Sequence, residues 1–148
     1  MSLTILGVDD DVVIHERLYK ARLTDPANGW TQATWRYHAA YTPPEAIDIM
    51  KREVIDIILL DNTITREGEG LDFLRDVRNN RIGLPHYVTI PIIMISADVV
   101  HEVAYSLGAT CYMDKYSLID SQEYYSLLVD ILQKYDQDRN INDLILRK

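Results

Sequence analysis

Five short strand-like segments, separated by helical patterns, are the feature of this 148-residue sequence that most limits its fold. Between them, apolar residues recur at helical spacing, as Ile14, Leu18 and Ala21 do. Strands that alternate with helices predict an α/β domain of three layers with a parallel sheet, and right-handed crossovers restrict it to a doubly wound arrangement. The predicted strands cover residues 3–8, 35–39, 56–60, 91–95 and 110–113.

Three of these segments carry further local signals. Residues 56–60 are nearly all apolar, which is typical of a central strand covered on both faces. Trp35, Tyr37 and Ala39 alternate with polar residues, which indicates a half-buried or edge strand. Thr42 before two prolines predicts the start of a helix.

Composition narrows the function classes. The length suits one domain, and the net charge of −8, from 15 basic and 23 acidic residues, disfavours direct binding to nucleic acid. A cation or a protein partner suits this charge better.

The single Cys111 fits a reducing compartment. We find no apolar run of membrane-spanning length and no signal peptide, so we expect a soluble cytoplasmic protein without membrane contact.

Polar residues lie where the predicted strands end. They are Asp9 and Asp10, Asp61, Ser96 and Lys115. Ligands of open parallel sheets bind at this carboxyl edge. Clustered carboxylates repel one another and attract a divalent cation, and Mg²⁺ prefers oxygen ligands. A nearby hydroxyl and ammonium can hold phosphate oxygens. The pattern therefore predicts a metal-assisted phosphoryl site with a carboxylate nucleophile.

Each of these residues also has an ordinary explanation. An Asp or Ser after a strand is usually a turn residue or a helix cap, and a single Lys is usually a surface charge. The ordinary explanations do not account for the joint placement at four strand ends, which carries the prediction.

Four motifs in order resemble the receiver domain of two-component response regulators, over about residues 3–136. They are Ile-Leu-Gly-Val-Asp-Asp-Asp at 5–11, Ile-Ile-Leu-Leu-Asp at 57–61, Ile-Ile-Met-Ile-Ser-Ala at 92–97 and Gly-Ala-Thr-Cys-Tyr-Met-Asp-Lys at 108–115. The resemblance implies a flavodoxin-like, five-stranded parallel sheet of order 2-1-3-4-5 with helices on both faces. It divides the chain into a receiver domain, 1–136, and a C-terminal tail, 137–148, which is helical or frayed.

The resemblance also implies a phosphoacceptor and a metal site. Asp61 would accept a phosphoryl group from a phosphohistidine on a histidine kinase or histidine phosphotransfer protein. Asp10 and Asp61 would coordinate Mg²⁺ directly, Asp9 would support it through water, and the backbone carbonyl of Thr63 would be a further ligand.

Three more residues match the family's switch. Lys115 would pair with the acyl phosphate, and Ser96 would hydrogen-bond one of its oxygens. Tyr112 occupies the position of the switch aromatic, which turns inward when Ser96 moves. This would remodel the face formed by helix 4, strand 5 and helix 5, where a downstream protein target binds.

The sequence departs from the family pattern near the phosphate. Tyr116 replaces the usual proline after the lysine, and the loop at 62–70 lacks the usual Met-Pro and is one residue longer. The loops at 24–32 and 79–90 are long as well. The acids, hydroxyl and lysine are all present, so we expect a competent receiver. The four histidines, among them His15, are expected to have surface or helix roles.

The sequence favours a single-domain response regulator that is not a separate enzyme. One alternative is a receiver-like module that binds proteins without phosphorylation. Another is an aspartyl-phosphate phosphohydrolase, because residues 61–65 fit the Asp-x-Thr-x-Thr pattern of haloacid-dehalogenase-like enzymes. Those enzymes place that motif on their first strand, which argues against the alternative. The cognate kinase, the output partner and homodimerisation stay open.

Overall fold

The computed structural model describes residues 2–25 and 35–139. Its strands form one parallel sheet in the order β2-β1-β3-β4-β5, which confirms the predicted topology. The strands are β1 (Thr4–Val8), β2 (Arg36–Ala40), β3 (Ile57–Leu60), β4 (Ile92–Ser96) and β5 (Cys111–Asp114).

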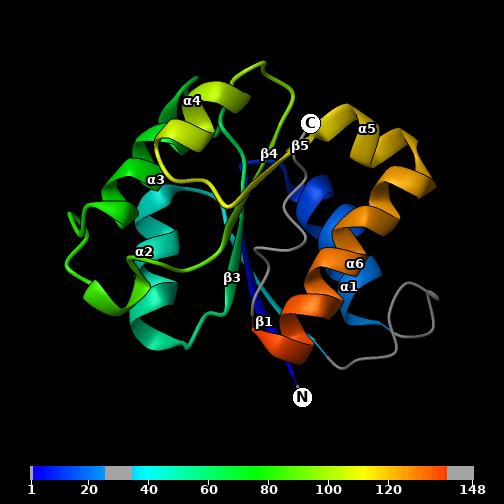
Figure 1. Ribbon diagram of the computed structural model, residues 1–148, viewed down its shortest axis with the longest axis horizontal. Coiled ribbons are helices and arrows are strands. Elements are labelled where there is room, and N and C mark those ends of the chain that lie inside the picture. Colours follow the sequence, from blue (N-terminus) through cyan, green and yellow to red (C-terminus); the bar gives the residue numbers. More distant parts are fainter. Residues whose placement is uncertain (1, 26–34, 140–148) are drawn as a thin grey trace.

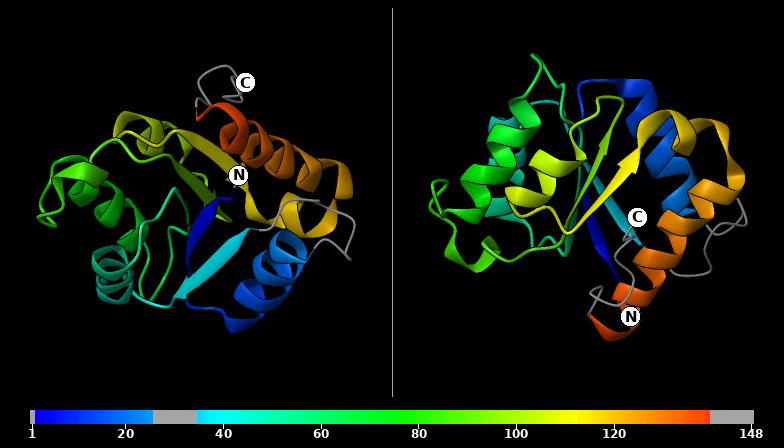
Figure 2. Two further views of the ribbon diagram at one scale, coloured as in Figure 1. Left: turned by 90° about the horizontal axis from the view of Figure 1, so that it is seen from below. Right: turned by 45° about the horizontal axis from the view of Figure 1, so that its top comes forward.

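Helices cover both faces of the sheet, as predicted (Figures 1 and 2). One face carries α2 (Pro43–Arg52), α3 (Glu69–Arg78) and α4 (His101–Ser106). The other carries the first helix, which is π-helical in η1 (Ile14–Lys20) and α-helical in α1 (Ala21–Thr24), together with α5 (Lys115–Asp120) and α6 (Gln122–Asp138). A 3₁₀ turn, η3 (Pro85–Tyr87), precedes β4.

The central strand β3 divides the core into two apolar clusters. Ile57 and Leu59 point to the cluster under α1 and α6, and Ile58 and Leu60 point to the cluster under α2 and α3. Successive side chains of a strand face opposite sides, so a strand covered on both faces must be apolar throughout. This confirms the prediction of a central strand, and β2 lies at an edge, also as predicted.

Helix boundaries follow local caps. The Thr42 hydroxyl accepts a hydrogen bond from the Glu45 N–H at 3.3 Å, and the Glu45 carboxylate accepts one from the Tyr41 N–H at 3.2 Å. This pattern is a variant of the capping box, in which Glu45 accepts from the residue before the N-cap Thr42, and it fixes the predicted start of α2. Helix α4 ends just before Gly108, whose φ of 103° lies in the left-handed region that favours glycine.

The sequence patterns missed α5, which lies between β5 and the predicted last helix. The Asp114 carboxylate accepts a hydrogen bond from the Ser117 N–H at 2.9 Å and so caps α5. The Ser121 hydroxyl does the same for Tyr124 in α6, at 3.1 Å. These two caps start two separate helices, and α5, with six residues, is too short to show an apolar stripe of its own. The peptide bond between Lys115 and Tyr116 is trans.

The last described helix continues to Asp138, past the predicted domain limit at residue 136. Most of the predicted tail, residues 140–148, lies outside the described residues, as does the greater part of the predicted loop at 24–32. No helix among the described residues is long and apolar enough to cross a membrane.

Gly70, at the start of α3, brings this helix against the end of β3. Its N–H donates to the Asn62 carbonyl at 2.8 Å, and a Cβ atom at this position would lie 1.9 Å from the Asp61 carbonyl oxygen. Gly70 therefore allows the close contact between backbone segments that fixes the loop after Asp61.

We expect Gly70→Ala to lower the free energy of unfolding by about 1–3 kcal/mol, because the added methyl group must displace backbone atoms. Chemical denaturation followed by circular dichroism measures the loss. Glu67→Ala, at an exposed position in the same loop, is the control and should change the value by less than about 0.5 kcal/mol. Equal stability of the two variants would contradict this account.

Candidate functional site

Three carboxylates meet at the carboxyl edge of the sheet. Asp9 and Asp10 follow β1, Asp61 follows β3, and one oxygen from each lies within 4.8 Å of the others. Backbone hydrogen bonds continue the strand pairing into this edge, since the Asp61 N–H donates to Val8 at 3.0 Å and the Asp9 N–H to Ala40 at 3.1 Å. The sheet register therefore brings these acids together.

Lys115, the first residue of α5, joins the cluster. Its Nζ lies 2.6 Å from Asp9 Oδ2 and 3.1 Å from Asp61 Oδ2. Asp9 and Asp61 are buried, with 1% and 7% of their surface exposed, whereas Asp10 is exposed to solvent. The ammonium group thus offsets the repulsion between the two buried carboxylates, and Asp10 forms the open side of the site.

Burial raises the pKa of Asp61 to about 6, against the opposing attraction of Lys115 and with a further increase from the charge of Asp9. Burial alone would lower the pKa of Lys115, but the hydrogen bond and charge of Asp9, with the charge of Asp61, outweigh burial and raise it. At neutral pH the site therefore holds a charged lysine beside a carboxylate that is more basic than usual, a property that favours nucleophilic attack.

The donor set fits a hard divalent cation. The available donors are carboxylate oxygens, and cations such as Mg²⁺ use one or two carboxylates while retaining several waters. Asp9 is the most constrained of the three acids, because its Oδ1 also accepts a hydrogen bond from the Asp11 N–H at 2.9 Å. The exposed Asp10 leaves this edge accessible to an ion and to a phosphoryl donor.

Asp98 is a site residue that the sequence patterns missed. Its Oδ2 accepts hydrogen bonds from Asn62 Nδ2 at 2.9 Å and from Thr63 Oγ1 at 2.8 Å. These two bonds hold its pKa below the usual range. The loop after β4 is thereby joined to the loop after β3, which carries the predicted phosphoacceptor.

The backbone of Asp98 contacts two of the predicted switch residues, Ser96 and Tyr112. Its N–H donates to the buried Ser96 Oγ at 2.9 Å, and its carbonyl accepts a hydrogen bond from the Tyr112 hydroxyl. Asp98 thus contacts Thr63, Ser96 and Tyr112. The only signal in the sequence was a carboxylate two residues after a serine, a spacing common in turns.

Tyr112 connects this loop to the surface of α4. Its N–H donates to the Tyr105 hydroxyl at 3.1 Å, and its ring centroid lies 5.9 Å from that of His101. A change in the loop at Asp98 can therefore reach α4 through one side chain.

His15 differs from the expectation of a surface or simple helical role. It lies in η1 but is buried, with 1% of its surface exposed, and it hydrogen-bonds the backbone carbonyl of Asp9 at 2.6 Å. Asp9 lies only 6 residues before His15, but the other partners, Tyr37 and Ala40, belong to β2, so only the tertiary structure shows the full set of contacts.

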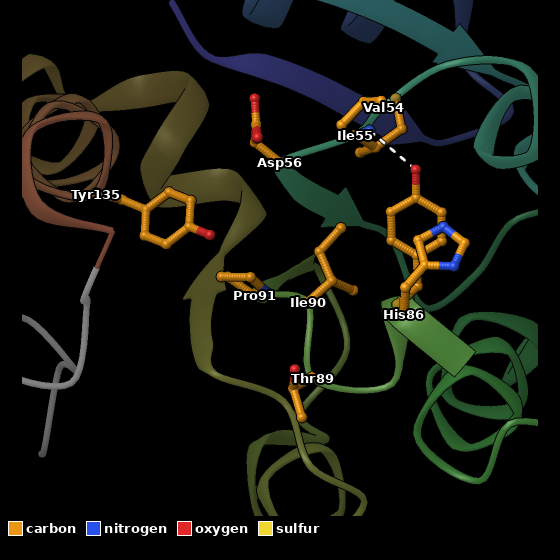
Figure 3. Close-up of a pocket in the computed structure, with 9 residues that line it drawn as sticks. Val54, Ile55, Asp56, His86, Thr89, Ile90, Pro91 and Tyr135 are labelled. Carbon is orange, nitrogen blue, oxygen red and sulfur yellow. Dashed lines mark hydrogen bonds between the residues drawn. The ribbon is translucent and has the colours of Figure 1, made fainter. Parts of the chain in front are cut away.

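A pocket at the opposite, amino edge of the sheet contains no comparable cluster (Figure 3). It has a volume of about 280 Å³ and lies where the chain enters β3 and β4. Its carboxylate, Asp56, accepts a hydrogen bond from the Thr4 N–H at 2.8 Å and pairs with Arg139 at 3.4 Å. These contacts give Asp56 a structural role.

No protein-family model matches this sequence, and a search of curated proteins finds no significant match. Solved structures do match. The receiver domain of a Francisella response regulator is 20% identical, with a TM-score of 0.65, over 90% of this chain and 98% of that chain. A CheY-like receiver protein from Methanospirillum hungatei is 22% identical, with a TM-score of 0.66, over 94% and 98%.

The phosphorylated cyanobacterial phytochrome response regulator RcpA also matches, at 18% identity with a TM-score of 0.68, over 95% of this chain and 97% of that chain. The chain therefore has the fold of response regulator receiver domains. This confirms, at the level of the fold, the resemblance found in the sequence motifs.

Lys115→Met tests the electrostatics of the site. Without the ammonium group, burial and the charge of Asp9 are opposed only by the backbone hydrogen bond from Asn62, so the pKa of Asp61 should rise above the value of about 6 in the metal-free protein. Carbon-13 NMR of the aspartate carboxyl groups, between about pH 4 and pH 9, measures this pKa.

The control is Lys134→Met, which removes a partly exposed lysine of α6 that lies 3.5 Å from Asp138 and should leave Asp61 unchanged. A pKa of Asp61 in Lys115→Met at or below that of the wild type would contradict the assignment.

Proposed function

We propose that this protein is a response regulator receiver in which Asp61 accepts a phosphoryl group from a partner phosphohistidine, with Mg²⁺ bound at the acid cluster. The observation that carries the proposal is the position of Lys115 Nζ, 2.6 Å from Asp9 and 3.1 Å from Asp61, beside the exposed Asp10. This arrangement lies at the ligand-binding edge of a receiver fold.

In the proposed transfer, a carboxylate oxygen of Asp61 attacks phosphorus, the bond from phosphorus to the histidine nitrogen breaks, and the partner's imidazole leaves. Asp10 and Asp61 would hold the ion directly, Asp9 would support it through water, and the Thr63 carbonyl would supply another ligand. Bound Mg²⁺ supplies positive charge that offsets the charge of the phosphoryl oxygens. Lys115 then pairs with the acyl phosphate, to which it is already close.

The signal passes through Ser96 and Tyr112. The Ser96 hydroxyl accepts a hydrogen bond from the Asp98 N–H. A hydroxyl also carries one proton to donate, and we propose that Ser96 turns this proton to a phosphate oxygen once Asp61 is phosphorylated. Movement of Ser96 toward the phosphate displaces the loop that also binds the Tyr112 hydroxyl. Phosphorylation thereby shifts the population between two positions of Tyr112.

The proposed output is a protein contact on the face of α4, β5 and the predicted helix 5, which is α6 in the structure, with α5 between β5 and α6. Large apolar side chains are exposed there, on Val99, Val103, Tyr105, Tyr116 and Ile119. Exposed apolar patches mark sites of protein interaction. The net charge of −8 disfavours nucleic acid as the target. We assign the protein no separate catalytic activity and place it in the cytoplasm with its kinase.

Phosphorylation of the purified protein by a small-molecule phosphodonor tests the proposal. With Mg²⁺, intact mass spectrometry should show one added phosphoryl group, because the proposal assigns a single acceptor, Asp61, while Asp9 and Asp10 support the metal. Asp61→Asn and the chelation of metal should each abolish the addition. The control is Asp56→Asn, which changes an aspartate at the other end of β3 and should be phosphorylated as the wild type is.

Other results favour the alternatives. Absence of phosphate uptake by the folded wild type would indicate a phosphorylation-independent binding module. Sustained release of phosphate from phosphomonoesters would indicate a hydrolase. Labelling that persists in Asp61→Asn would place the acceptor elsewhere.

Asp98→Ala tests the contact between the two loops. The change removes the carboxylate that accepts from Asn62 and Thr63, so amide hydrogen exchange in both loops should accelerate by about tenfold. Exchange measured by mass spectrometry, with the exposed Asp48→Ala in α2 as control, gives the comparison. Unchanged protection of residues 62–65 in Asp98→Ala would refute this role.

A further inference from the structure

The imidazole of the buried His15 has a hydrogen-bond partner at each nitrogen. Its Nε2 lies 2.6 Å from the Asp9 carbonyl oxygen and 3.1 Å from the Ala40 carbonyl oxygen. Its Nδ1 lies 2.6 Å from the Tyr37 hydroxyl. The ring therefore links η1 to the end of β1 and to the edge strand β2.

The partners define the protonation of the ring. Carbonyl oxygens only accept hydrogen bonds, so Nε2 must carry a proton that it donates to Asp9 and Ala40. In the neutral ring Nδ1 then accepts the proton of the Tyr37 hydroxyl. Burial raises the pKa of Tyr37 well above its usual value, which keeps this hydroxyl protonated as a donor.

Asp9 is consequently held through both its backbone and its side chain. Its N–H donates to the Ala40 carbonyl at 3.1 Å, and its own carbonyl accepts from His15. Its carboxylate accepts from the Asp11 N–H and from Lys115. Of these contacts, that with His15 fixes the peptide plane between Asp9 and Asp10, and so the direction in which the chain presents Asp10.

The surrounding fold makes room for this contact. A Cβ atom on Gly7 would lie 1.8 Å from the Tyr37 hydroxyl oxygen, so the absence of a side chain on β1 allows Tyr37 to reach His15. The π-helical geometry of η1 begins at Ile14, beside His15, and such local departures from the α-helix are frequent at functional sites. Tyr19 from the same helix packs against Tyr37 with a centroid distance of 5.9 Å.

We propose that His15 is a positioning residue for the cation site: it holds the Asp9–Asp10 peptide in the orientation that binds the metal, and Tyr37 fixes the ring that does so. This inference rests on the proposed function, because it concerns the same acid cluster. An apolar side chain of similar size could fill the space but could not donate to the Asp9 carbonyl. The buried carbonyl would then lose this donor, and the turn would rearrange to recover a hydrogen bond.

The effect on metal affinity follows from this contact. Residues that orient metal ligands through hydrogen bonds typically change affinity by about 10–100-fold when they are replaced. His15→Leu should therefore weaken Mg²⁺ binding by at least about tenfold. His15→Gln retains an amide donor and should recover most of the affinity. Tyr37→Phe, which removes only one hydroxyl, should weaken binding by a few-fold.

Two measurements on each folded variant form the test. Isothermal titration calorimetry with Mg²⁺ alone measures affinity. Amide hydrogen exchange of the metal-free protein, resolved by NMR, measures how firmly residues 9–11 are held. In His15→Leu and Tyr37→Phe the amides of Asp9 and Asp11 should exchange faster than in the wild type, and His15→Gln should reverse most of this change.

Tyr125→Phe is the matched control. It removes a buried tyrosine hydroxyl of α6 that donates to the carbonyl of Leu18, and Leu18 lies on η1, the helix that carries His15. It should lower the melting temperature without changing Mg²⁺ affinity or exchange at residues 9–11. If His15→Leu does not fold, Tyr37→Phe and His15→Gln decide the question through the same measurements.

The inference would be overturned if folded His15→Leu bound Mg²⁺ and exchanged its amides as the wild type does. If that variant does not fold, the same result in Tyr37→Phe would overturn it. Either result would leave the proposed function intact. Failure of the wild type to bind Mg²⁺ would instead count against the proposed function. The exchange measurement, made without metal, would still show whether His15 holds the turn.

Discussion

The arrangement of charges at the carboxyl edge of the sheet is the constraint on which the rest of the structure depends. Asp9 and Asp61 are buried close together, and each alone would be costly to ionise there. The ammonium of Lys115 lies 2.6 Å from Asp9 and 3.1 Å from Asp61 and reduces that cost. Burial still raises the pKa of Asp61 to about 6. The apolar core fixes the strands, and the strands keep the acids together against their repulsion.

Two supports surround this cluster on opposite sides. On the side of β2, His15 holds the backbone of Asp9. On the side of β4, Asp98 joins the loop after Asp61 to Ser96 and Tyr112. The first support concerns the geometry of the acids, and the second connects that geometry to α4. The proposed metal site and the proposed switch are therefore held by different hydrogen bonds.

Much of the fold was predictable because its signals are local. The apolar run of β3, the alternation in β2 and the capping box of α2 each follow from neighbouring residues. The patterns missed α5 because it has only six residues, of which only Leu118 is buried, so no repeating stripe marks it. The caps at Asp114 and Ser121 start α5 and α6 separately. Local periodicity measures which faces are apolar, and it does not record where one helix ends and the next begins.

By itself, the sequence determined where the strands lie along the chain and which acids, hydroxyl and lysine follow them, because strand periodicity and the carboxyl-edge rule need only neighbouring residues and chain direction. The spatial order of the strands came from the resemblance of the four motifs to receiver domains. Only the tertiary structure decided that His15 is buried against Asp9 and that Asp98 contacts Thr63, Ser96 and Tyr112. Most of these contacts join loops and strands that meet only after the sheet has formed. A hydrogen bond between such segments requires no repeating pattern in the sequence, so sequence patterns do not reveal it.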